Sequence, residues 1–212
     1  LARPNRRVAR DPEVRAAARS TVRILGTACG LGIEGSGWVA APGLVVTNAH
    51  VVAGEDDTTV QPQGTGQRYS ATAVWFDPRN DVALLRASDL GGLPPLRLNA
   101  GAGAGASGAI IGYPENGPLD VEAARLGPTI QALAQDAYGR GPLRRRITTL
   151  RGLVRSGNSG GPVVDGGGRV LTTVFASSSA RGEHAGYGVP DTVVRSALAR
   201  AHGAVDTGPC AR

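Results

Sequence analysis

The sequence contains no methionine and no lysine, so all 23 basic residues are arginine and Leu1 is not a translational start. We therefore expect a fragment whose targeting or anchoring segment lies upstream of Leu1. Aromatic residues make up only 4% of the chain, so the core is expected to consist mainly of Val, Leu, Ile and Ala. Fourteen prolines and 32 glycines indicate frequent turns, which favours short strands over long helices.

The sequence also lacks any run of the roughly 18 apolar residues that a membrane-spanning helix needs, and no secretory signal opens it. Contact with a membrane is therefore expected only through an upstream segment. The net charge of +6 would allow nucleic-acid binding, but the arginines are scattered apart from two groups, at residues 3–10 and 144–146. No aromatic stacking pattern accompanies either group, so we expect no nucleic-acid partner. Arg144-Arg145-Arg146 is expected to be solvated loop charge, with a regulatory or acidic-partner role as the alternative.

Cysteine is nearly absent: Cys29 and Cys210 are the only two, one near each end of the chain. Neither has a CxxC partner and there are only three histidines, so no structural zinc site is expected, and no cofactor is predicted. The two thiols either remain free and buried or form one disulfide that ties the tail to the first strand. We expect the disulfide, which would indicate an oxidising, extracytoplasmic compartment.

Turn signals divide the chain into many short predicted strands and two helices. Residues 1–10 are polar and Arg-rich and are interpreted as a linker. Asp11 and Pro12 predict the start of a helix that ends near Arg19, and a second helix is predicted to begin at Asp191. Strands are predicted at 21–26, 35–40, 44–47, 69–76, 81–86, 109–114, 119–126, 129–133, 146–150, 162–164, 170–176 and 187–190.

The segment from Leu93 to Gly108 is rich in Pro, Gly and Ala and is the best candidate for a linker between two halves. We therefore divide the chain into residues 11–100 and residues 101–212. Many short strands with few helices predict an all-β fold built from barrels.

Residues 155–162, Arg-Ser-Gly-Asn-Ser-Gly-Gly-Pro, favour neither a helix nor a strand. A tight turn here can hold the Ser159 hydroxyl at the mouth of a pocket and direct backbone N–H groups toward a developing negative oxygen. The alternative is an ordinary glycine-rich turn. A serine nucleophile requires a base to take its proton and a third group to orient that base.

His50 is the best candidate for the base, because it follows a predicted strand in an apolar setting. His184 and His202 lie in segments that read as solvated surface. Asp81 directly precedes the apolar run 82–85, where a carboxylate must be paired or hydrogen-bonded. The alternatives are a structural histidine bonded to the backbone and a capping or turn aspartate.

These residues carry a resemblance to chymotrypsin-fold serine proteases. Three blocks occur in that family's order, His then Asp then Ser: residues 47–52, 81–85 and 157–162. Two further blocks, residues 110–114 and 186–190, are similar to the bacterial HtrA branch. The resemblance covers about residues 22–200 and implies two six-stranded antiparallel β-barrels with the cleft between them, in addition to the two terminal helices.

The resemblance implies a serine endopeptidase in which Ser159 attacks the scissile carbonyl, His50 acts as general base and Asp81 orients His50. The N–H groups of Gly157 and Ser159 would form the oxyanion hole. The implied substrate pocket consists of Leu153, Val154, Phe175, Ala176, Ser177, Tyr187 and Gly188.

Two departures from the family pattern bear on activation and specificity. Asn158 precedes the nucleophile where a carboxylate would be needed to pair with a newly cut N-terminus, so digestive-type zymogen activation is not expected. Leu153 occupies the expected pocket floor, which predicts a preference for apolar residues on the acyl side of the cut.

The resemblance also implies protein or peptide substrates and a stress-related, extracytoplasmic location, with a tether to the inner membrane upstream of Leu1. Because the first 30 residues lack the aromatic residue typical of HtrA trimerisation segments, we expect a monomeric domain. Two other function classes are possible for this sequence: a catalytically silent protease fold used as a scaffold, and an esterase. The esterase is disfavoured because the chain lacks alternating strands and helices and the Ser-Asp-His order.

Overall fold

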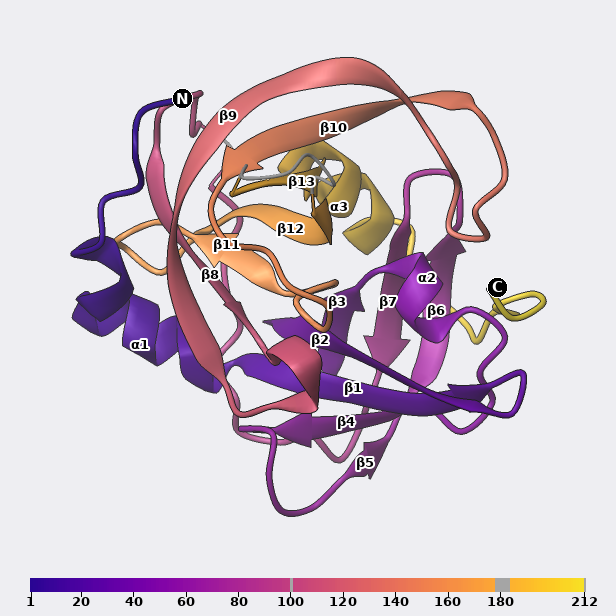
Figure 1. Cartoon of the computed structure of the whole chain (residues 1–212). Coiled ribbons are helices and arrows are strands. Elements are labelled where there is room, and N and C mark those ends of the chain that lie inside the picture. The colour runs from indigo at the N-terminus through magenta and orange to yellow at the C-terminus, as the bar shows by residue number, and fades with distance from the viewer. Residues whose placement is uncertain (100, 178–183, 212) are drawn as a thin grey trace.

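The computed structural model describes residues 1–99, 101–177 and 184–211, and its strands form two antiparallel sheets (Figure 1). The first sheet has the order β5-β4-β1-β2-β3-β7-β6, and the second is a closed barrel of order β10-β13-β12-β11-β8-β9. The strands of the first sheet are β1 (Thr21–Ala28), β2 (Leu31–Ala41), β3 (Leu44–Thr47), β4 (Thr59–Pro62), β5 (Tyr69–Ser70), β6 (Thr72–Asp77) and β7 (Val82–Arg86). Those of the barrel are β8 (Ser107–Gly112), β9 (Asp120–Ala134), β10 (Leu143–Arg151), β11 (Pro162–Val164), β12 (Val170–Ser177) and β13 (Ala185–Pro190).

The predicted fold class is confirmed, but the first sheet differs from the expected six-stranded barrel. It has seven strands, and β5 and β6 are its edges in the part of the chain that is described. The single strand predicted at 69–76 is interrupted at Ala71, whose N–H donates to the Thr58 carbonyl oxygen. The interruption leaves β5 paired with β4 and β6 paired with β7.

The longest strand, β9, replaces two strands that the sequence predicts at 119–126 and 129–133. Gly127 and Pro128 lie inside it rather than in a turn. Opposite them, the register with β10 shifts between Thr148 and Leu150. Because Pro128 has no N–H to donate, it fits a strand only at such an irregularity.

The helices are α1 (Pro12–Arg19), α2 (Ala49–Val52) and α3 (Asp191–Leu198), with 3-10 turns η1 (Val8–Arg10) and η2 (Pro114–Asn116). The start and end predicted for α1 and the start predicted for α3 are confirmed. Asp11 occupies the N-cap position of α1, but its side chain makes no capping hydrogen bond. Within residues 1–10, Val8 is buried against the main core.

The core is largely aliphatic, as the composition predicts, and it joins the two sheets. Trp38 of β2 is fully buried, and its indole N–H donates to Thr173 Oγ1 of β12 at 3.1 Å. The same cluster includes Val46 from the first sheet and Ile111 and Val164 from the barrel. Residues contributed by the two sheets therefore pack against one another rather than across a solvent layer.

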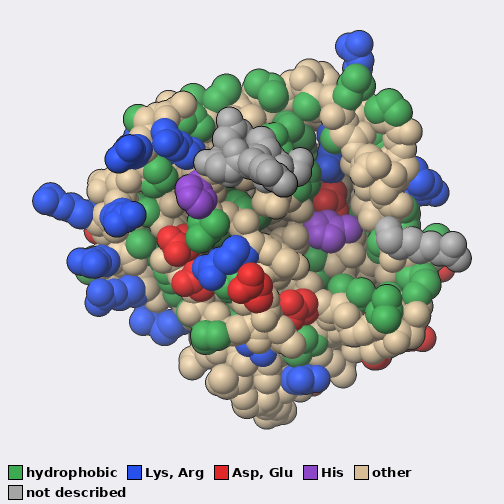
Figure 2. Space-filling model, viewed as in Figure 1, with side chains coloured by type: hydrophobic (Ala, Val, Ile, Leu, Met, Phe, Trp, Pro, Cys, Tyr) green, Lys and Arg blue, Asp and Glu red, His purple; other side chains and the backbone are tan. Residues whose placement is uncertain are grey.

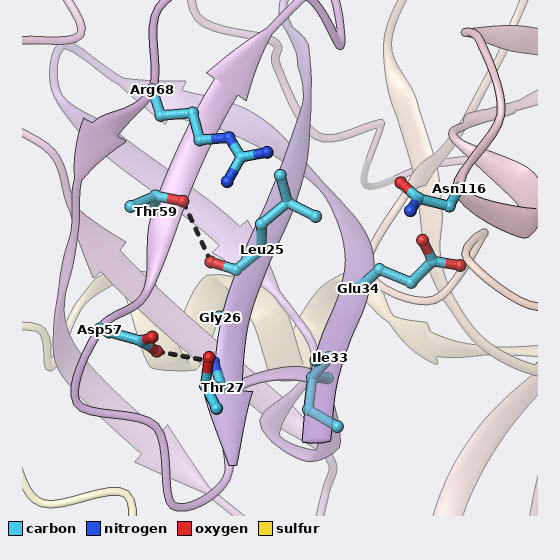
Figure 3. Close-up of a pocket in the computed structure, with 10 residues that line it drawn as sticks. Leu25, Gly26, Thr27, Ile33, Glu34, Asp57, Thr59, Arg68 and Asn116 are labelled. Atoms are coloured by element: carbon cyan, nitrogen blue, oxygen red, sulfur yellow. Dashed lines mark hydrogen bonds between the residues drawn. The ribbon is translucent and has the colours of Figure 1, made fainter. Parts of the chain in front are cut away.

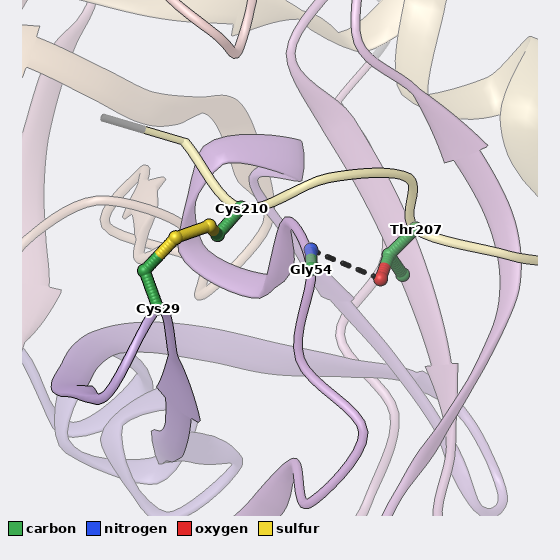
Figure 4. The surroundings of a disulfide bond; sticks show 4 residues. All are labelled: Cys29, Gly54, Thr207 and Cys210. Atoms are coloured by element: carbon green, nitrogen blue, oxygen red, sulfur yellow. Dashed lines mark hydrogen bonds between the residues drawn. A yellow bond between two sulfur atoms is a disulfide. The ribbon is translucent and has the colours of Figure 1, made fainter.

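The expected disulfide between Cys29 and Cys210 is present (Figure 4). Cys29 lies in the turn between β1 and β2, and its Cα is 5.9 Å from that of Cys210. Nearby, the N–H of Gly54 donates to Thr207 Oγ1 at 3.1 Å. The C-terminal tail is thus attached beside the end of α2. No helix among the described residues is long and apolar enough to cross a membrane.

Glu55 lies just after α2, and its buried carboxyl group makes the folded protein more stable at acidic pH. Its Oε2 accepts a hydrogen bond from Thr58, whereas its buried Oε1 has no partner among the described residues. Burial, opposed in part by Thr58 and reinforced by Asp57, raises the pKa of Glu55 from 4.5 to about 7. The folded protein therefore holds a proton that the unfolded chain releases, and stability falls as pH rises between these two values.

We predict that Glu55→Gln raises the free energy of unfolding at pH 8 by on the order of 1–3 kcal/mol and has little effect near pH 4. Urea denaturation across this range measures the effect. The exposed neighbour substitution Asp56→Asn is the matched control and should leave the pH dependence unchanged. A Glu55→Gln variant with the wild-type slope between pH 5 and 7 would contradict the assignment.

Candidate active site

His50 and Asp81 form a hydrogen-bonded pair at one end of the first sheet. The short helix α2 carries His50, and Asp81 directly precedes β7 with a left-handed backbone (φ 59°). His50 Nδ1 lies 2.9 Å from Asp81 Oδ2 and 3.0 Å from Oδ1, and the backbone N–H of His50 donates to Oδ1 at 3.0 Å. Asn48 Nδ2 donates to the Asp81 carbonyl oxygen at 2.9 Å. The arrangement fixes the orientation of the imidazole.

The pair favours an ionised carboxylate and a basic imidazole. Burial alone would raise the pKa of Asp81, but the His50 charge and the hydrogen bonds from His50 outweigh it and lower that pKa. Burial alone would lower the pKa of His50, yet the Asp81 carboxylate leaves it raised above its usual value. Because a carboxylate can only accept, Nδ1 carries the hydrogen, and Nε2 of the neutral ring has a free lone pair.

Ser159 lies in a turn that both sheets hold in place. Its carbonyl oxygen accepts the Ser36 N–H of β2 at 2.8 Å, and the next N–H, of Gly160, donates to the Val174 carbonyl of β12 at 2.8 Å. The Ser159 hydroxyl donates to the Phe175 carbonyl oxygen at 3.4 Å. In the described residues no hydrogen bond joins Ser159 Oγ to His50.

In the same turn, the N–H groups on either side of Asn158 are unoccupied in the described part of the chain. The N–H of Asn158 donates to the Arg155 carbonyl, whereas those of Gly157 and Ser159 have no acceptor among the described residues. The Ser156 carbonyl accepts the Glu115 N–H at 2.8 Å. Since N–H and C=O point in opposite directions in a trans peptide, the N–H of Gly157 points away from Glu115. Gly157 has φ +86°, and any Cβ added to it would overlap the Tyr113 carbonyl oxygen.

Ser36 is a positioning residue that sequence reasoning missed. It is fully buried, and its hydroxyl donates to the Gly157 carbonyl at 2.7 Å while accepting the Tyr113 N–H at 2.9 Å. Its own carbonyl accepts Thr47 Oγ1 at 2.8 Å. One residue of the first sheet thereby contacts both sides of the serine turn. Its place between Gly35 and Gly37 was the only available signal.

The residues predicted to form the substrate pocket lie on the barrel side of Ser159. Phe175 and Tyr187 stack with their ring centroids 6.3 Å apart. The Val154 side chain packs against Gly186, whereas Leu153, expected at the pocket floor, is 37% exposed. The remaining predicted pocket residues, Ala176, Ser177 and Gly188, lie on β12 and β13.

The interpretation of Arg144-Arg145-Arg146 as solvated loop charge is wrong: none of the three lies in a loop, and the central one is not solvated. All three lie on β10, where side chains alternate between the two faces of the strand. Arg144 and Arg146 are exposed, but Arg145 is buried, with its guanidinium carbon 4.3 Å from the centroid of the Phe175 ring. Three consecutive arginines give no sequence signal that one of them faces inward.

The face seen in Figure 2 carries basic side chains mostly around its margin and acidic side chains nearer its centre. A surface groove of about 630 Å³ lies against β1, β2 and β4 (Figure 3). Glu34 and Asn116 lie on the same side of it, with their polar ends toward each other, and Leu25 points into it. Gly35, the residue after Glu34, packs closely against the Ser159 carbonyl oxygen. The groove therefore begins beside the serine turn.

Among the described residues, no group of three or more His, Cys, Asp and Glu side chains could hold a metal ion. The functional groups of the site are a basic imidazole paired with a carboxylate, the Ser159 hydroxyl, and the free N–H groups of Gly157 and Ser159. Such a set suits nucleophilic attack on a carbonyl group.

Comparison with known proteins identifies the class. Residues 35–171 match the trypsin-like peptidase domain, and the chain belongs to this family of serine proteases. It is 36% identical to the serine protease Rv3671c of Mycobacterium tuberculosis over 181 residues, which are 84% of this chain and 45% of that protein. The chain thus spans less than half the length of this relative.

Solved structures give the same result. The active form of the Rv3671c protease from M. tuberculosis superposes with a TM-score of 0.91 at 36% identity, covering 100% of this chain and 94% of that one. The inactive form gives 0.81 at 35% identity, covering 96% and 99%. The HtrA-type protease AlgW with a tripeptide gives 0.78 at 26% identity, covering 92% and 63%.

Proposed function

We propose that the chain is an endopeptidase domain that cleaves proteins or peptides through Ser159, His50 and Asp81. The observation that carries this proposal is the His50–Asp81 pair at 2.9 Å, together with a Ser159 turn in which two N–H groups lack acceptors. In the proposed reaction, His50 Nε2 takes the proton from the Ser159 hydroxyl as Ser159 Oγ attacks the scissile carbonyl. His50 then donates that proton to the leaving amine, and water hydrolyses the acyl-enzyme.

Asp81 acts in this reaction without accepting the proton. Its carboxylate holds Nδ1–H, which keeps Nε2 available as the base, and it stabilises the imidazolium that forms. The Ser159 hydroxyl must turn from the Phe175 carbonyl toward His50 when substrate binds. A contact of 3.4 Å is long for an O–H donor, so little stabilisation is lost when the hydroxyl rotates away from Phe175.

The N–H groups of Gly157 and Ser159 are proposed to stabilise the oxyanion. In this proposal the Glu115 N–H and the Ser36 hydroxyl hold the two peptides on either side of Gly157 in the competent orientation. Each oxyanion donor contributes about 3–4 kcal/mol to transition-state stabilisation.

We predict that Gly157→Ala lowers kcat about 10²- to 10³-fold, because its Cβ would displace the peptide from the Tyr113 carbonyl and misdirect one oxyanion donor. Gly92→Ala is the matched control, since Gly92 also has positive φ (+82°) but open space around its Cα. Steady-state hydrolysis of a peptide, with thermal denaturation of both variants, measures the effect. Equal kcat values for the two folded variants would exclude an oxyanion role for Gly157.

Specificity is proposed to come from Phe175, Ala176, Ser177, Tyr187 and Gly188, with Leu153 and Val154 at the base. The absence of a carboxylate among these residues favours apolar side chains on the acyl side of the cut. The groove beside Glu34 is proposed to hold the leaving-group side of an extended substrate. Strong selection for Arg or Lys in peptide-library profiling would contradict the pocket assignment.

The location and wider role are likewise proposals. The Cys29–Cys210 disulfide supports an oxidising, extracytoplasmic compartment. Tethering to the inner membrane through a segment outside this sequence and a stress-related role rest on the resemblance to HtrA proteases. The monomeric domain rests on a departure from them, because the first 30 residues contain no aromatic residue.

The proposed activity is tested by incubating the purified domain with an unfolded protein and identifying new termini by mass spectrometry. Cleavage by the wild type and none by Ser159→Ala, purified in parallel, is expected. Equal cleavage by both proteins would show that Ser159 is not the nucleophile. Hydrolysis of activated esters without any peptide cleavage would favour the esterase, and absence of both would favour a silent scaffold.

A further inference from the structure

Arg145 is a buried cation whose hydrogen-bonding capacity is largely unused. Its side chain extends from β10, and the residue is only 6% exposed. Its Nε and Nη1 are buried and have no acceptor among the described residues. A buried guanidinium without partners is costly, so its presence requires a compensating interaction.

The surroundings of Arg145 connect it to the catalytic residues. The guanidinium lies over the Phe175 ring, and the backbone carbonyl of Phe175 accepts the Ser159 hydroxyl. Three carboxylates act on the Arg145 charge: Asp81 from the turn before β7, Asp77 at the end of β6, and Asp136 after β9. None of them forms an ion pair with Arg145 within 4.0 Å in the part of the chain that is described. The charge therefore acts through space rather than through a closed pair.

The Arg145 charge favours the neutral form of His50 and the ionised form of Asp81, which are the forms that the proposed reaction needs. Two charged groups act on the imidazole: the Asp81 carboxylate, which favours its protonation, and Arg145, whose smaller effect opposes it. Arg145 also favours the ionised form of Asp81. A general base that is already protonated cannot accept the serine proton, so any group that opposes protonation of His50 preserves activity at lower pH.

We propose that Arg145 is a positioning residue of the triad, whose buried charge beside the His50–Asp81 pair extends proteolysis to lower pH than the pair alone would permit. The inference rests on the proposed function. It assigns to the middle arginine of the 144–146 run a role that its two exposed neighbours do not share. Packing over Phe175 holds the guanidinium in place, because an arginine plane stacks well on an aromatic face.

The test is the pH profile of kcat/KM for Arg145→Met, with Arg144→Met as the matched control that removes one charge from the same strand. In the profile of Arg145→Met, the acid limb is expected to shift to higher pH by about 0.5–1 unit. Arg144→Met and the charge-retaining Arg145→Lys should keep the wild-type limb. Arg145→Gln is measured in parallel, so that a folding defect of the Met variant does not decide the result. A uniform loss of activity with an unmoved limb would reduce Arg145 to a packing role and overturn the proposal.

A second readout separates this proposal from the proposed function. NMR titration of the His50 ring in a Ser159→Ala background measures its protonation without catalysis. A higher His50 pKa on adding Arg145→Met or Arg145→Gln supports the charge effect, even if the wild type hydrolyses nothing. An unchanged His50 pKa in both variants would overturn it, even if the wild type is an active protease.

Discussion

Asp81→Asn is expected to lower kcat about 10⁴-fold while leaving KM within a few-fold of the wild type. The asparagine amide can still accept the His50 backbone N–H, so α2 and the turn before β7 should keep their positions. However, its NH₂ group can donate to His50 Nδ1 and favour the tautomer in which Nε2 carries hydrogen. That tautomer cannot take the serine proton, and the charge that stabilises the imidazolium is also lost.

Kinetics with a peptide cleaved by the wild type measure this effect. Asp89→Asn, an exposed carboxylate in a loop after β7, is the matched control and should retain wild-type kcat. A loss of less than tenfold for Asp81→Asn, in a variant with unchanged thermal stability, would show that His50 does not depend on this carboxylate.

Removing the disulfide is expected to produce the largest change in stability. Cys29 and Cys210 are separated by 181 residues, and in the chain-entropy model closing so long a loop contributes about 4–5 kcal/mol. Other contacts also hold the tail. They include the Val205 N–H to the Ala73 carbonyl at 2.9 Å and the Tyr138 hydroxyl to the Thr207 carbonyl at 2.7 Å.

We expect Cys29→Ser, Cys210→Ser and the double variant each to lower the melting temperature by about 10–15 °C, because each breaks the same bond. Thermal denaturation with and without a reducing agent measures it. The wild type under reducing conditions should match the variants, and the variants should not respond to the reductant. A double variant within about 1 kcal/mol of the wild type would show that the tail is held by its other contacts.

The candidate site was predictable where its chemistry is local in sequence. Ser159 and Gly157 lie in one turn, and the turn's glycines indicate a backbone that few other residues can adopt. His50 and Asp81 each follow or precede an apolar strand, so their pairing could be anticipated once the order of the blocks was recognised. The disulfide could be predicted because the sequence contains only two cysteines.

The remainder depends on contacts that the sequence does not encode locally. Ser36 reaches Gly157 only because β2 packs against the barrel, across a separation of 121 residues. Arg145 is buried because side chains alternate between the two faces of a strand and this one faces inward. Three identical residues in a row do not show which of them faces inward. The break at Ala71 that divides β5 from β6 arises from its hydrogen bond to Thr58, which belongs to another segment.

The most direct test of the central claim is covalent labelling of Ser159 by a serine-directed fluorophosphonate, followed by peptide mass spectrometry. A hydroxyl becomes reactive toward such a probe when an adjacent base accepts its proton. We predict a single adduct on Ser159 in the wild type, a strongly reduced adduct in His50→Ala and none in Ser159→Ala. Wild-type protein that resists the probe as fully as Ser159→Ala does, or an adduct at another serine, would contradict this prediction.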